Sequence, residues 1–265
     1  MQTTTRQTQA FKPFYFVLTG DPHVGFAKGT NRRFARQRRQ INRLKPAVVL
    51  VPGDMTHRLK KKMTDDLDPA LKKFKVPVHF IPGNHDIRDH ETLQNYRQRY
   101  GKDYYVFTHN NCDFICLNSM TLCTDTYYFN IKDSDFRAEV RAQWNWLEKT
   151  LAQSRGQKRT HIFILLHNPP YTKTEDERHK LTNMHPTARR RLLTLARKYR
   201  VRIILAGHTH TTKECSTGDF TIYTVGGTFR PMDLRGYGYR IFKVQDDWIA
   251  SKYIRLDNPP KNLDF

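Results

Sequence analysis

Five short apolar runs, each followed closely by Asp, Asn or His, constrain the fold of this chain more than any other feature. Each run has the length of a buried strand, and Gly or Pro within three residues ends it. Because the carboxyl ends of parallel strands lie at one edge of a sheet, we expect the polar residues behind them to converge there. The runs are residues 14–18, 47–51, 78–81, 162–166 and 203–205.

Amphipathic stretches and aromatic hairpins fill the chain between these runs. Residues 31–44 place Phe34, Ile41 and Leu44 on one helical face, and Asp135 is suited to cap another helix. Strand–helix alternation together with hairpins predicts an α/β fold in which two packed sheets carry outer helices. The other predicted helices are residues 66–74, 135–153 and 188–199, and the predicted hairpin strands are residues 104–107, 114–117, 220–225 and 239–244.

The polar residues behind the five runs make up the ligand set of a divalent first-row metal, for which manganese, iron and zinc are about equally suited. Seven side chains are too many for one tetrahedral ion, but with Asp54 shared they divide into four for each of two metals. Two metals acidify a bridging water and clamp the attacking and leaving oxygens at phosphorus, which is phosphoester hydrolysis. The seven candidates are Asp21, His23, Asp54, Asn84, His167, His208 and His210.

Each motif by itself is weak evidence. An isolated Asp-x-His is usually a surface turn, and an isolated histidine at a strand end is more often hydrogen-bonded in the core. Five motifs in order, each at the end of a strand, favour a shared site over these alternatives.

In this order the motifs resemble those of the calcineurin-like metallophosphoesterases, from about residue 14 to residue 256. The resemblance implies a four-layer α/β/β/α sandwich, the metallo-dependent phosphatase fold, with two mixed sheets flanked by helices. It implies a single domain over residues 13–258, with a polar N-terminal tail at 1–12 and a C-terminal tail at 259–265. The matching motifs are Asp21-x-His23, Gly53-Asp54, Gly83-Asn84-His85-Asp86, His167 and Gly207-His208-x-His210.

The resemblance also implies roles for individual residues. His85 is expected to protonate the leaving oxygen or steady the transition state, with Asp86 orienting its ring, and histidine exchanges a proton near neutral pH. One metal would be held by Asp21, His23, Asp54 and His210, and the other by Asp54, Asn84, His167 and His208. Three residues near the motifs are candidates for substrate contacts: His57, Lys173 and Arg230.

Departures from the family pattern indicate which branch of the family this chain resembles most. Purple acid phosphatases carry Tyr where His57 stands, and the Arg that precedes Gly-Asn-His in the large serine/threonine phosphatases is Pro82 here. Class III cyclic-nucleotide phosphodiesterases usually have paired histidines at the fourth motif, where this chain has His167 and Asn168. The chain most resembles the small calcineurin-like phosphoesterase-domain phosphatases, which are phosphomonoesterases, some of them acting on phosphoserine or phosphothreonine proteins.

Basic residues greatly outnumber acidic ones. Lys and Arg total 46 against 25 Asp and Glu, so the formal net charge is +21. Such a field attracts anions: phosphorylated substrates, nucleic acid or acidic lipid headgroups. Clusters within residues 28–45, 58–62 and 189–200 make a polyanion or nucleic-acid partner possible, although no nucleic-acid-binding motif accompanies them.

The sequence carries no sign of a membrane span or of a secretory signal. No apolar run approaches the roughly 18 residues of a span, the N-terminus is polar, and the four cysteines show no CxxC spacing. We therefore expect reduced thiols and a cytoplasmic location. The expected activity is that of a metal-dependent phosphoric ester hydrolase, a phosphomonoesterase that attacks with a metal-bridging hydroxide. The alternatives are a phosphodiesterase acting on cyclic nucleotide or nucleic acid, and an inactive basic scaffold that binds phosphorylated partners.

Overall fold

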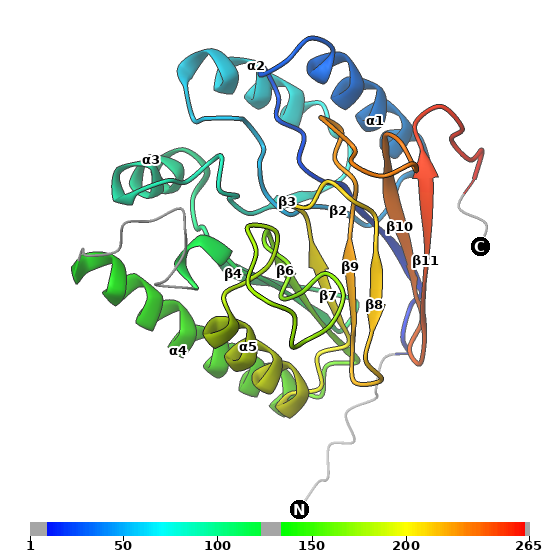
Figure 1. The fold of residues 1–265 in the computed structure, drawn as a ribbon. Coiled ribbons are helices and arrows are strands. Elements are labelled where there is room, and N and C mark those ends of the chain that lie inside the picture. Colours follow the sequence, from blue (N-terminus) through cyan, green and yellow to red (C-terminus); the bar gives the residue numbers. More distant parts are fainter. Residues whose placement is uncertain (1–9, 123–133, 263–265) are drawn as a thin grey trace, which may run out of the picture.

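Two sheets packed face to face form the centre of the computed structural model, which describes residues 10–122 and 134–262 (Figure 1). In the first sheet the strand order is β11-β10-β1-β2-β3. β1, β2 and β3 run parallel, and an antiparallel hairpin of β10 and β11 pairs with the other edge of β1. The strands are β1 (Phe14–Leu18), β2 (Val48–Val51), β3 (Val78–Phe80), β10 (Gly238–Val244) and β11 (Ile249–Arg255).

The second sheet has the order β4-β5-β6-β7-β9-β8. Its four inner strands are parallel, and the edge strands β4 and β8 are antiparallel to their neighbours. Asn110 and Asn111 join β4 to β5 with φ angles of 43° and 58°, the left-handed pair that a two-residue hairpin turn needs. The strands are β4 (Tyr105–His109), β5 (Cys112–Cys116), β6 (His161–Leu166), β7 (Ile203–Ala206), β8 (Glu214–Ser216) and β9 (Thr221–Thr224).

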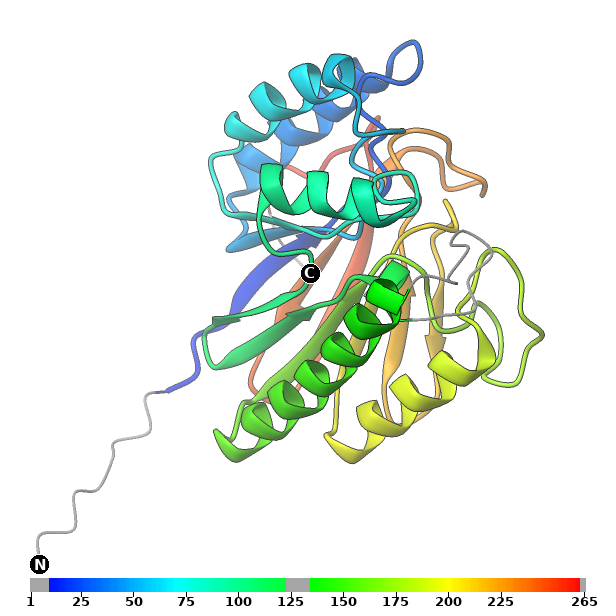
Figure 2. The same ribbon diagram turned by 90° about the vertical axis from the view of Figure 1, so that its left-hand side faces the viewer.

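Helices cover the outer face of each sheet, which confirms the predicted four layers (Figure 2). Phe34 and Leu67, from the helices on the first sheet, share a buried cluster with Val17 and Val49. Within residues 10–122 and 134–262, no helix is long and apolar enough to cross a bilayer. The helices are α1 (Thr30–Leu44) and α2 (Lys61–Lys72) on the first sheet, α4 (Ser134–Gly156) and α5 (Pro186–Lys198) on the second, α3 (His90–Tyr100) and the 3-10 turn Ser119–Thr121.

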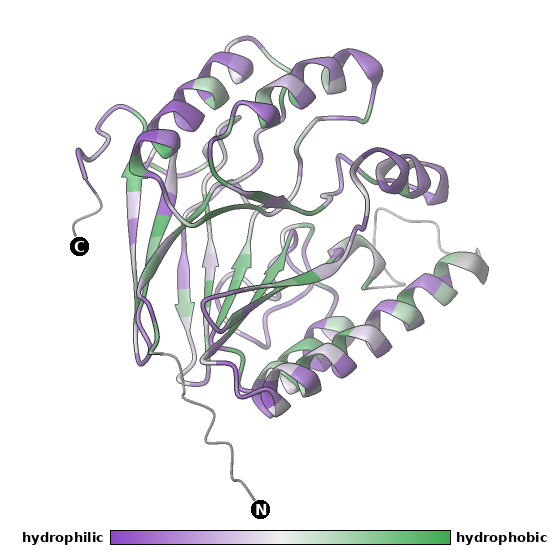
Figure 3. Ribbon diagram, turned by 180° about the vertical axis from the view of Figure 1, so that it is seen from behind, coloured by the Kyte–Doolittle hydropathy of each residue, from purple (hydrophilic) through white to green (hydrophobic). Residues whose placement is uncertain are grey.

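Alternation along the strands divides the apolar residues between two interfaces. Phe16 of β1 faces the second sheet: its ring stacks on Phe242 at 4.6 Å and meets Phe114 and Phe163 edge-on at 5.4 Å. Val17, the next residue, belongs instead to the cluster beneath α1. Figure 3 shows apolar residues concentrated in the central strands and hydrophilic ones on the outer helices, as a layered fold requires.

α3 and two strand pairings differ from the sequence prediction. Only Leu93 and Tyr96 of α3 are buried, so the helix lacks the apolar stripe that marks helices in a sequence. Segments 220–225 and 239–244 do lie in hairpins, but β9 pairs with β8 and β10 with β11, in different sheets. α2 begins at Lys61 instead of residue 66. The predicted cap at Asp135 falls on a side chain outside the described ones.

The stacked rings between the sheets give a test of the fold. Because Phe16 is fully buried, Phe16→Ala should lower the free energy of unfolding by about 3–5 kcal/mol, through lost transfer energy and a cavity. Phe16→Leu keeps most of the volume and should cost about 1.5 kcal/mol or less. Urea unfolding followed by far-UV circular dichroism measures both. Equal, small losses for the two variants would show that Phe16 is not at the centre of the core.

Candidate metal centre

The predicted ligands lie together at the carboxyl ends of β1, β2, β3, β6 and β7, because the loops that carry them follow those strands directly. Asp54 is at the middle of the cluster, with its Oδ2 3.5 Å from His23 Nε2 and 3.4 Å from His167 Nε2. Asp21 lies beside it, with Oδ1 3.7 Å from His167 Nδ1 and Oδ2 3.8 Å from His210 Nε2. Three strand ends of the first sheet and two of the second therefore contribute to one site.

The ligand atoms divide into two sets that share Asp54. Within each set, the candidate ligand atoms all lie within 4.8 Å of one another. Asn84 joins the second set, since its Oδ1 is 3.0 Å from His167 Nε2, and His208 Nδ1 is 3.1 Å from the same nitrogen. The sets are His23, Asp54 and His210, and Asp54, His167 and His208.

Several buried polar atoms of this cluster make no hydrogen bond in the described part of the chain. They include both carboxylate oxygens of Asp21 and both ring nitrogens of His23, in side chains that are almost fully buried. Burying a polar group without a partner costs roughly 2–7 kcal/mol. A bound cation would supply the missing partner, and carboxylate, amide and imidazole are the donors that divalent first-row metals take. The residues therefore fit a metal centre.

Backbone conformation at the site is unusual for residues that bear side chains. Asp21, His23, Asp54, His208 and His210 have φ angles of 38°, 41°, 50°, 65° and 52°, in the left-handed region that few residues other than glycine enter. Such strain gathers at functional sites, where the surrounding structure holds it. The motif glycines serve close approach, because a Cβ on Gly53 would stand 2.6 Å from His167 Nδ1.

Main-chain carbonyl groups fix the proton on three of the histidines. His167 Nδ1 donates to Pro52 O at 2.6 Å, and His210 Nδ1 donates to Arg230 O at 2.8 Å. His208 is held the other way round, since its Nε2 donates to Leu181 O at 2.6 Å. A carbonyl oxygen can only accept, so the opposite nitrogen of each ring is the one left for a metal.

The loop between β6 and α5, which carries Leu181, is held by Glu177. The Glu177 carboxylate accepts from Thr172 N at 2.8 Å, from Lys173 N at 3.0 Å and from Asn183 Nδ2 at 2.6 Å. The buried Arg189 donates to the Glu177 carbonyl oxygen at 2.8 Å. These bonds fix the loop conformation that presents the Leu181 carbonyl to His208.

Burial and the neighbouring carboxylates set the protonation of the cluster. Burial lowers the pKa of His23 and of His208 to about 3, so both rings are neutral at pH 7, as ligands must be. Burial acts against the charge on His167 too, but Asp54 and Asp21 outweigh it and raise the pKa of His167 to about 9. Metal binding at His167 therefore has to release a proton.

His85 and Asp86 have different partners from the expected ones. The backbone N–H of His85 donates to Asp54 Oδ1 at 2.9 Å, and its ring Nδ1 lies 3.3 Å from both His57 O and Arg88 Nη2. Asp86 is buried, and its carboxylate accepts four hydrogen bonds, from Gly83 N, Met55 N, Thr56 N and Thr56 Oγ1. Asp86 thus ties the second motif to the third. His57 O and Arg88 lie at hydrogen-bond distance from the His85 ring, and the His23 ring packs edge-on against it with centroids 4.9 Å apart.

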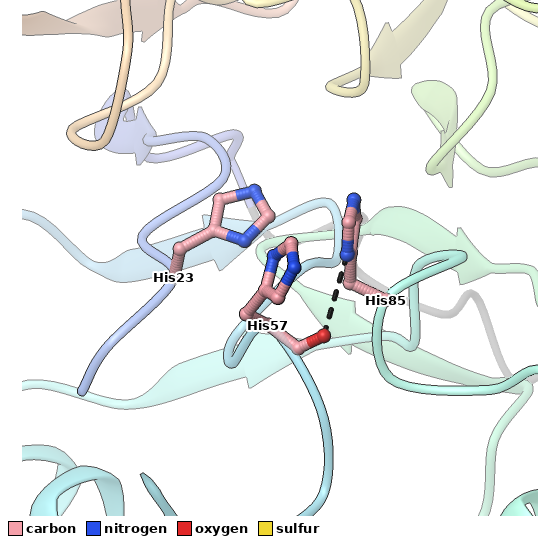
Figure 4. A group of neighbouring side chains, drawn as sticks. All are labelled: His23, His57 and His85. Carbon is pink, nitrogen blue, oxygen red and sulfur yellow. Dashed lines mark hydrogen bonds between the residues drawn. The ribbon is translucent and has the colours of Figure 1, made fainter. Parts of the chain in front are cut away.

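The three candidates for substrate contact are placed differently. His57 lies at the site, where its ring is 4.1 Å from that of His85 and stacks on Phe26 at 3.6 Å. Figure 4 shows the rings of His23, His57 and His85 gathered together. The Arg230 side chain is exposed, and the residue reaches the site through its carbonyl oxygen. Lys173 is exposed, and its N–H donates to Glu177.

Sequence reasoning missed Arg88, Glu177 and the carbonyls of Pro52, Leu181 and Arg230. A main-chain oxygen leaves no trace in residue type, so the carbonyls carried no signal. Arg88 did carry one, because it is a basic residue three positions after His85 in the same loop. Glu177 is an acid in a loop rich in charged residues, and nothing in the sequence separates it from Glu175.

Comparison with known proteins bears on the whole chain. Residues 14–212 match the family model described as calcineurin-like phosphoesterase. The serine/threonine-protein phosphatase CPPED1 of Rattus norvegicus is 27% identical over 288 residues, covering 94% of this chain and 86% of the relative. A probable cyclic nucleotide phosphodiesterase of Vesicomyosocius okutanii is 30% identical over 179 residues, covering 66% of this chain and 67% of the relative.

A solved structure shares the fold. The dimetal phosphatase from Danio rerio superimposes with a TM-score of 0.74 at 14% identity, covering 92% of this chain and 97% of that one. The resemblance seen in the sequence motifs and the predicted fold class are both confirmed. The chain belongs to the calcineurin-like phosphoesterase family and is a binuclear-metal phosphoric ester hydrolase.

Proposed function

We propose that this enzyme is a phosphomonoesterase whose seven predicted ligands hold the two metals. The observation that carries the proposal is the pair of ligand sets that share Asp54. Arg88 supports the monoester, because its exposed guanidinium lies beside His85 and makes no ion pair with any described carboxylate. A monoester dianion carries one more negative charge than a diester, and a further cation at the site favours it.

Asp54 has a separate task for each of its oxygens. Oδ2 faces both histidines, His23 and His167, so Asp54 belongs to both ligand sets and would help to hold both metals. Oδ1 accepts from the His85 backbone N–H, which keeps the carboxylate from turning. Two bound divalent ions would supply an activated water nucleophile and would neutralise charge at the phosphoryl oxygens. Manganese, iron and zinc all suit the donors.

His85 holds a proton toward the substrate with the help of Arg88. Arg88 Nη2 can only donate, and the His57 carbonyl oxygen can only accept. A neutral His85 that accepts from Arg88 at Nδ1 keeps its own proton on Nε2, where it can bond a phosphoryl or leaving oxygen. A ring that donates Nδ1–H to His57 O leaves Nε2 without a proton. The hydrogen bond from Arg88 is therefore the one that would place the proton of His85 on Nε2.

A phosphodiesterase is the second candidate. The similarity to the probable cyclic nucleotide phosphodiesterase favours it, and the same metal ligands would serve. The presence of all seven ligands together with His85 weighs against an inactive scaffold. A cytoplasmic location and a nucleic-acid partner remain predictions.

Hydrolysis of para-nitrophenyl phosphate and of its bis-ester, in manganese, tests monoesterase against diesterase. We expect a higher kcat/KM for the monoester, and Asp54→Asn should reduce it by more than about a hundredfold because both metals depend on that carboxylate. Asp89→Asn is the matched control, since Asp89 caps α3 and Asn caps a helix equally well. Preference for the bis-ester would replace the monoester proposal by the diester one. Full turnover by Asp54→Asn would exclude the two-metal mechanism.

The role of His85 is tested by its own removal and by that of Arg88. His85→Ala should lower kcat by roughly 10²–10⁴-fold, and Arg88→Ala should lower it by about 10-fold. In both variants two metals per chain should remain bound. Both losses should shrink for esters of acidic phenols, whose leaving oxygens need no proton. Metal content from mass spectrometry accompanies the kinetics. Loss of a metal in His85→Ala would identify His85 as a ligand instead.

Glu177 is predicted to act on the metal centre through the Leu181 carbonyl. Glu177→Gln should weaken binding of one of the two metals by about 10–100-fold, the usual effect of losing an outer-shell partner of a metal ligand. Glu175→Gln makes the same chemical change in the same loop but removes only a surface pair with Arg197, and should leave both affinities unchanged. Titration calorimetry with manganese measures them. Equal manganese affinities in the Glu177→Gln and Glu175→Gln variants would show that Glu177 does not act on the metal centre.

A further inference from the structure

Exposed apolar side chains gather on the loops that hold the metal centre. In residues 10–122 and 134–262, seven large apolar side chains are exposed, and five of them lie on these loops. The remaining two, Val106 on β4 and Trp248 in the turn between β10 and β11, lie elsewhere. A contiguous exposed apolar patch marks a binding surface, whereas single exposed apolar side chains are ordinary, so their gathering around one site is the informative feature. The five are Phe26, Leu181, Met232, Leu234 and Tyr237, and we call them the apolar rim.

Contacts join the rim to the site. The ring of Phe229 lies 5.3 Å from that of Phe26 and 4.7 Å from that of His23. Met232 N donates to His210 O at 2.8 Å. Leu234 is two residues further along, so its Cα lies within about 7 Å of the Met232 Cα.

The rim flanks the two ligand sets on separate loops. Leu181 belongs to the loop whose carbonyl holds His208, and Met232 and Leu234 belong to the loop whose carbonyl holds His210. Figure 2 shows the β9–β10 loop (orange) and the β6–α5 loop (yellow-green) projecting on the same side of the molecule. An extended chain that passes over the metals can therefore meet apolar side chains before and after the position of phosphorus.

Charge around the rim is positive. Arg230, Arg235 and Lys28 are exposed, and none of them pairs with a carboxylate in the part of the chain that the structure describes. The acid within residues 229–237 is Asp233, whose carboxylate is occupied by the N–H groups of Thr212 and Arg235. The surface therefore complements an anionic partner as well as an apolar one.

We propose that the apolar rim docks the segment of a phosphorylated protein on both sides of its phosphoresidue, an inference that rests on the proposed phosphomonoesterase function. The phosphate anchors the segment at the metals, and two or three residues on either side of it reach the rim. Arg230 and Arg235, which pair with no described carboxylate, attract the negatively charged segment. A bilayer is the less suitable occupant, because its phosphates lie above its apolar layer, whereas here the apolar side chains stand beside the phosphate position. Leu234 and Met232 are thus specificity-determining residues.

Two phosphoserine peptides of equal length and charge test the proposal. One carries Leu on both sides of the phosphoserine, and the other carries Ser there. The wild-type enzyme should show a kcat/KM about tenfold higher for the Leu peptide, through a lower KM, because about one side chain becomes buried. Leu234→Ser should remove that preference and leave hydrolysis of para-nitrophenyl phosphate unchanged. Leu234 is fully exposed, so this variant should fold normally.

Trp248→Ser is the control away from the rim, since Trp248 is also a large exposed apolar side chain, 41% exposed against 103% for Leu234. It should keep the wild-type preference for the Leu peptide. Equal kcat/KM values for the two peptides in the wild type, or equal behaviour of Leu234→Ser and Trp248→Ser, would overturn the proposal. So would a Leu234→Ser variant that loses binding to phosphatidylserine vesicles while it keeps the peptide preference, which would assign the rim to a bilayer.

Failure of the proposed function is distinguishable from failure of this inference. Fluorescence anisotropy of the same two peptides reports docking, and it is measured in manganese with His85→Ala, the variant expected to keep its metals and to turn over slowly. Tighter binding of the Leu peptide by an enzyme that hydrolyses no monoester would retain the docking surface and reject the monoesterase. Equal binding of both peptides by an enzyme that hydrolyses para-nitrophenyl phosphate would retain the monoesterase and reject the docking surface.

Discussion

The structure is organised around two carboxylates, Asp21 and Asp54, that are buried where loops from both sheets meet. Taking a carboxylate out of water is tolerable only beside positive charge or hydrogen-bond donors. Asp54 has the histidines and one backbone N–H, whereas among the described residues the oxygens of Asp21 accept no hydrogen bond and have only His167 and His210 near them. Demand for cations at this point explains why the chain brings so many histidines to one edge and why it holds several ligands in left-handed backbone.

The two sheets supply the rigidity that this arrangement needs. The ring of Phe16 stacks on that of Phe242 within the first sheet and meets Phe114 and Phe163 of the second. Interiors of this kind are as densely packed as organic crystals, so the strand ends keep fixed separations. Asp86 extends that rigidity into the loops, because its hydrogen bonds fasten the loop after β2 to the loop after β3.

The strands, and the gathering of the candidate ligands at one edge, could be predicted from the sequence, and the reason is local. A buried strand is a short apolar run, and its first polar followers must lie at the edge of the sheet; both facts are visible along the chain. α3 could not be predicted in the same way, because its contacts use Leu93 and Tyr96 alone. The pairing of β8 with β9 could not be predicted either. β8 has only three residues and none is fully buried, so it shows no alternation of apolar and polar residues along the chain. Arg88 and Glu177 make their contacts with His85 and with the β6–α5 loop only in the folded chain.

Main-chain carbonyls, instead of side chains, fix the orientation of three of the candidate ligand histidines. The backbone and the side chains of these loops are therefore under different evolutionary constraints. At positions 181 and 230 the backbone path has to be conserved, but the side chains there can change without disturbing the histidines they orient. The loops around the centre can therefore drift in sequence while the chemistry stays intact. A family built on this plan is able to acquire new substrates by altering the outward side of loops whose inward side is main chain.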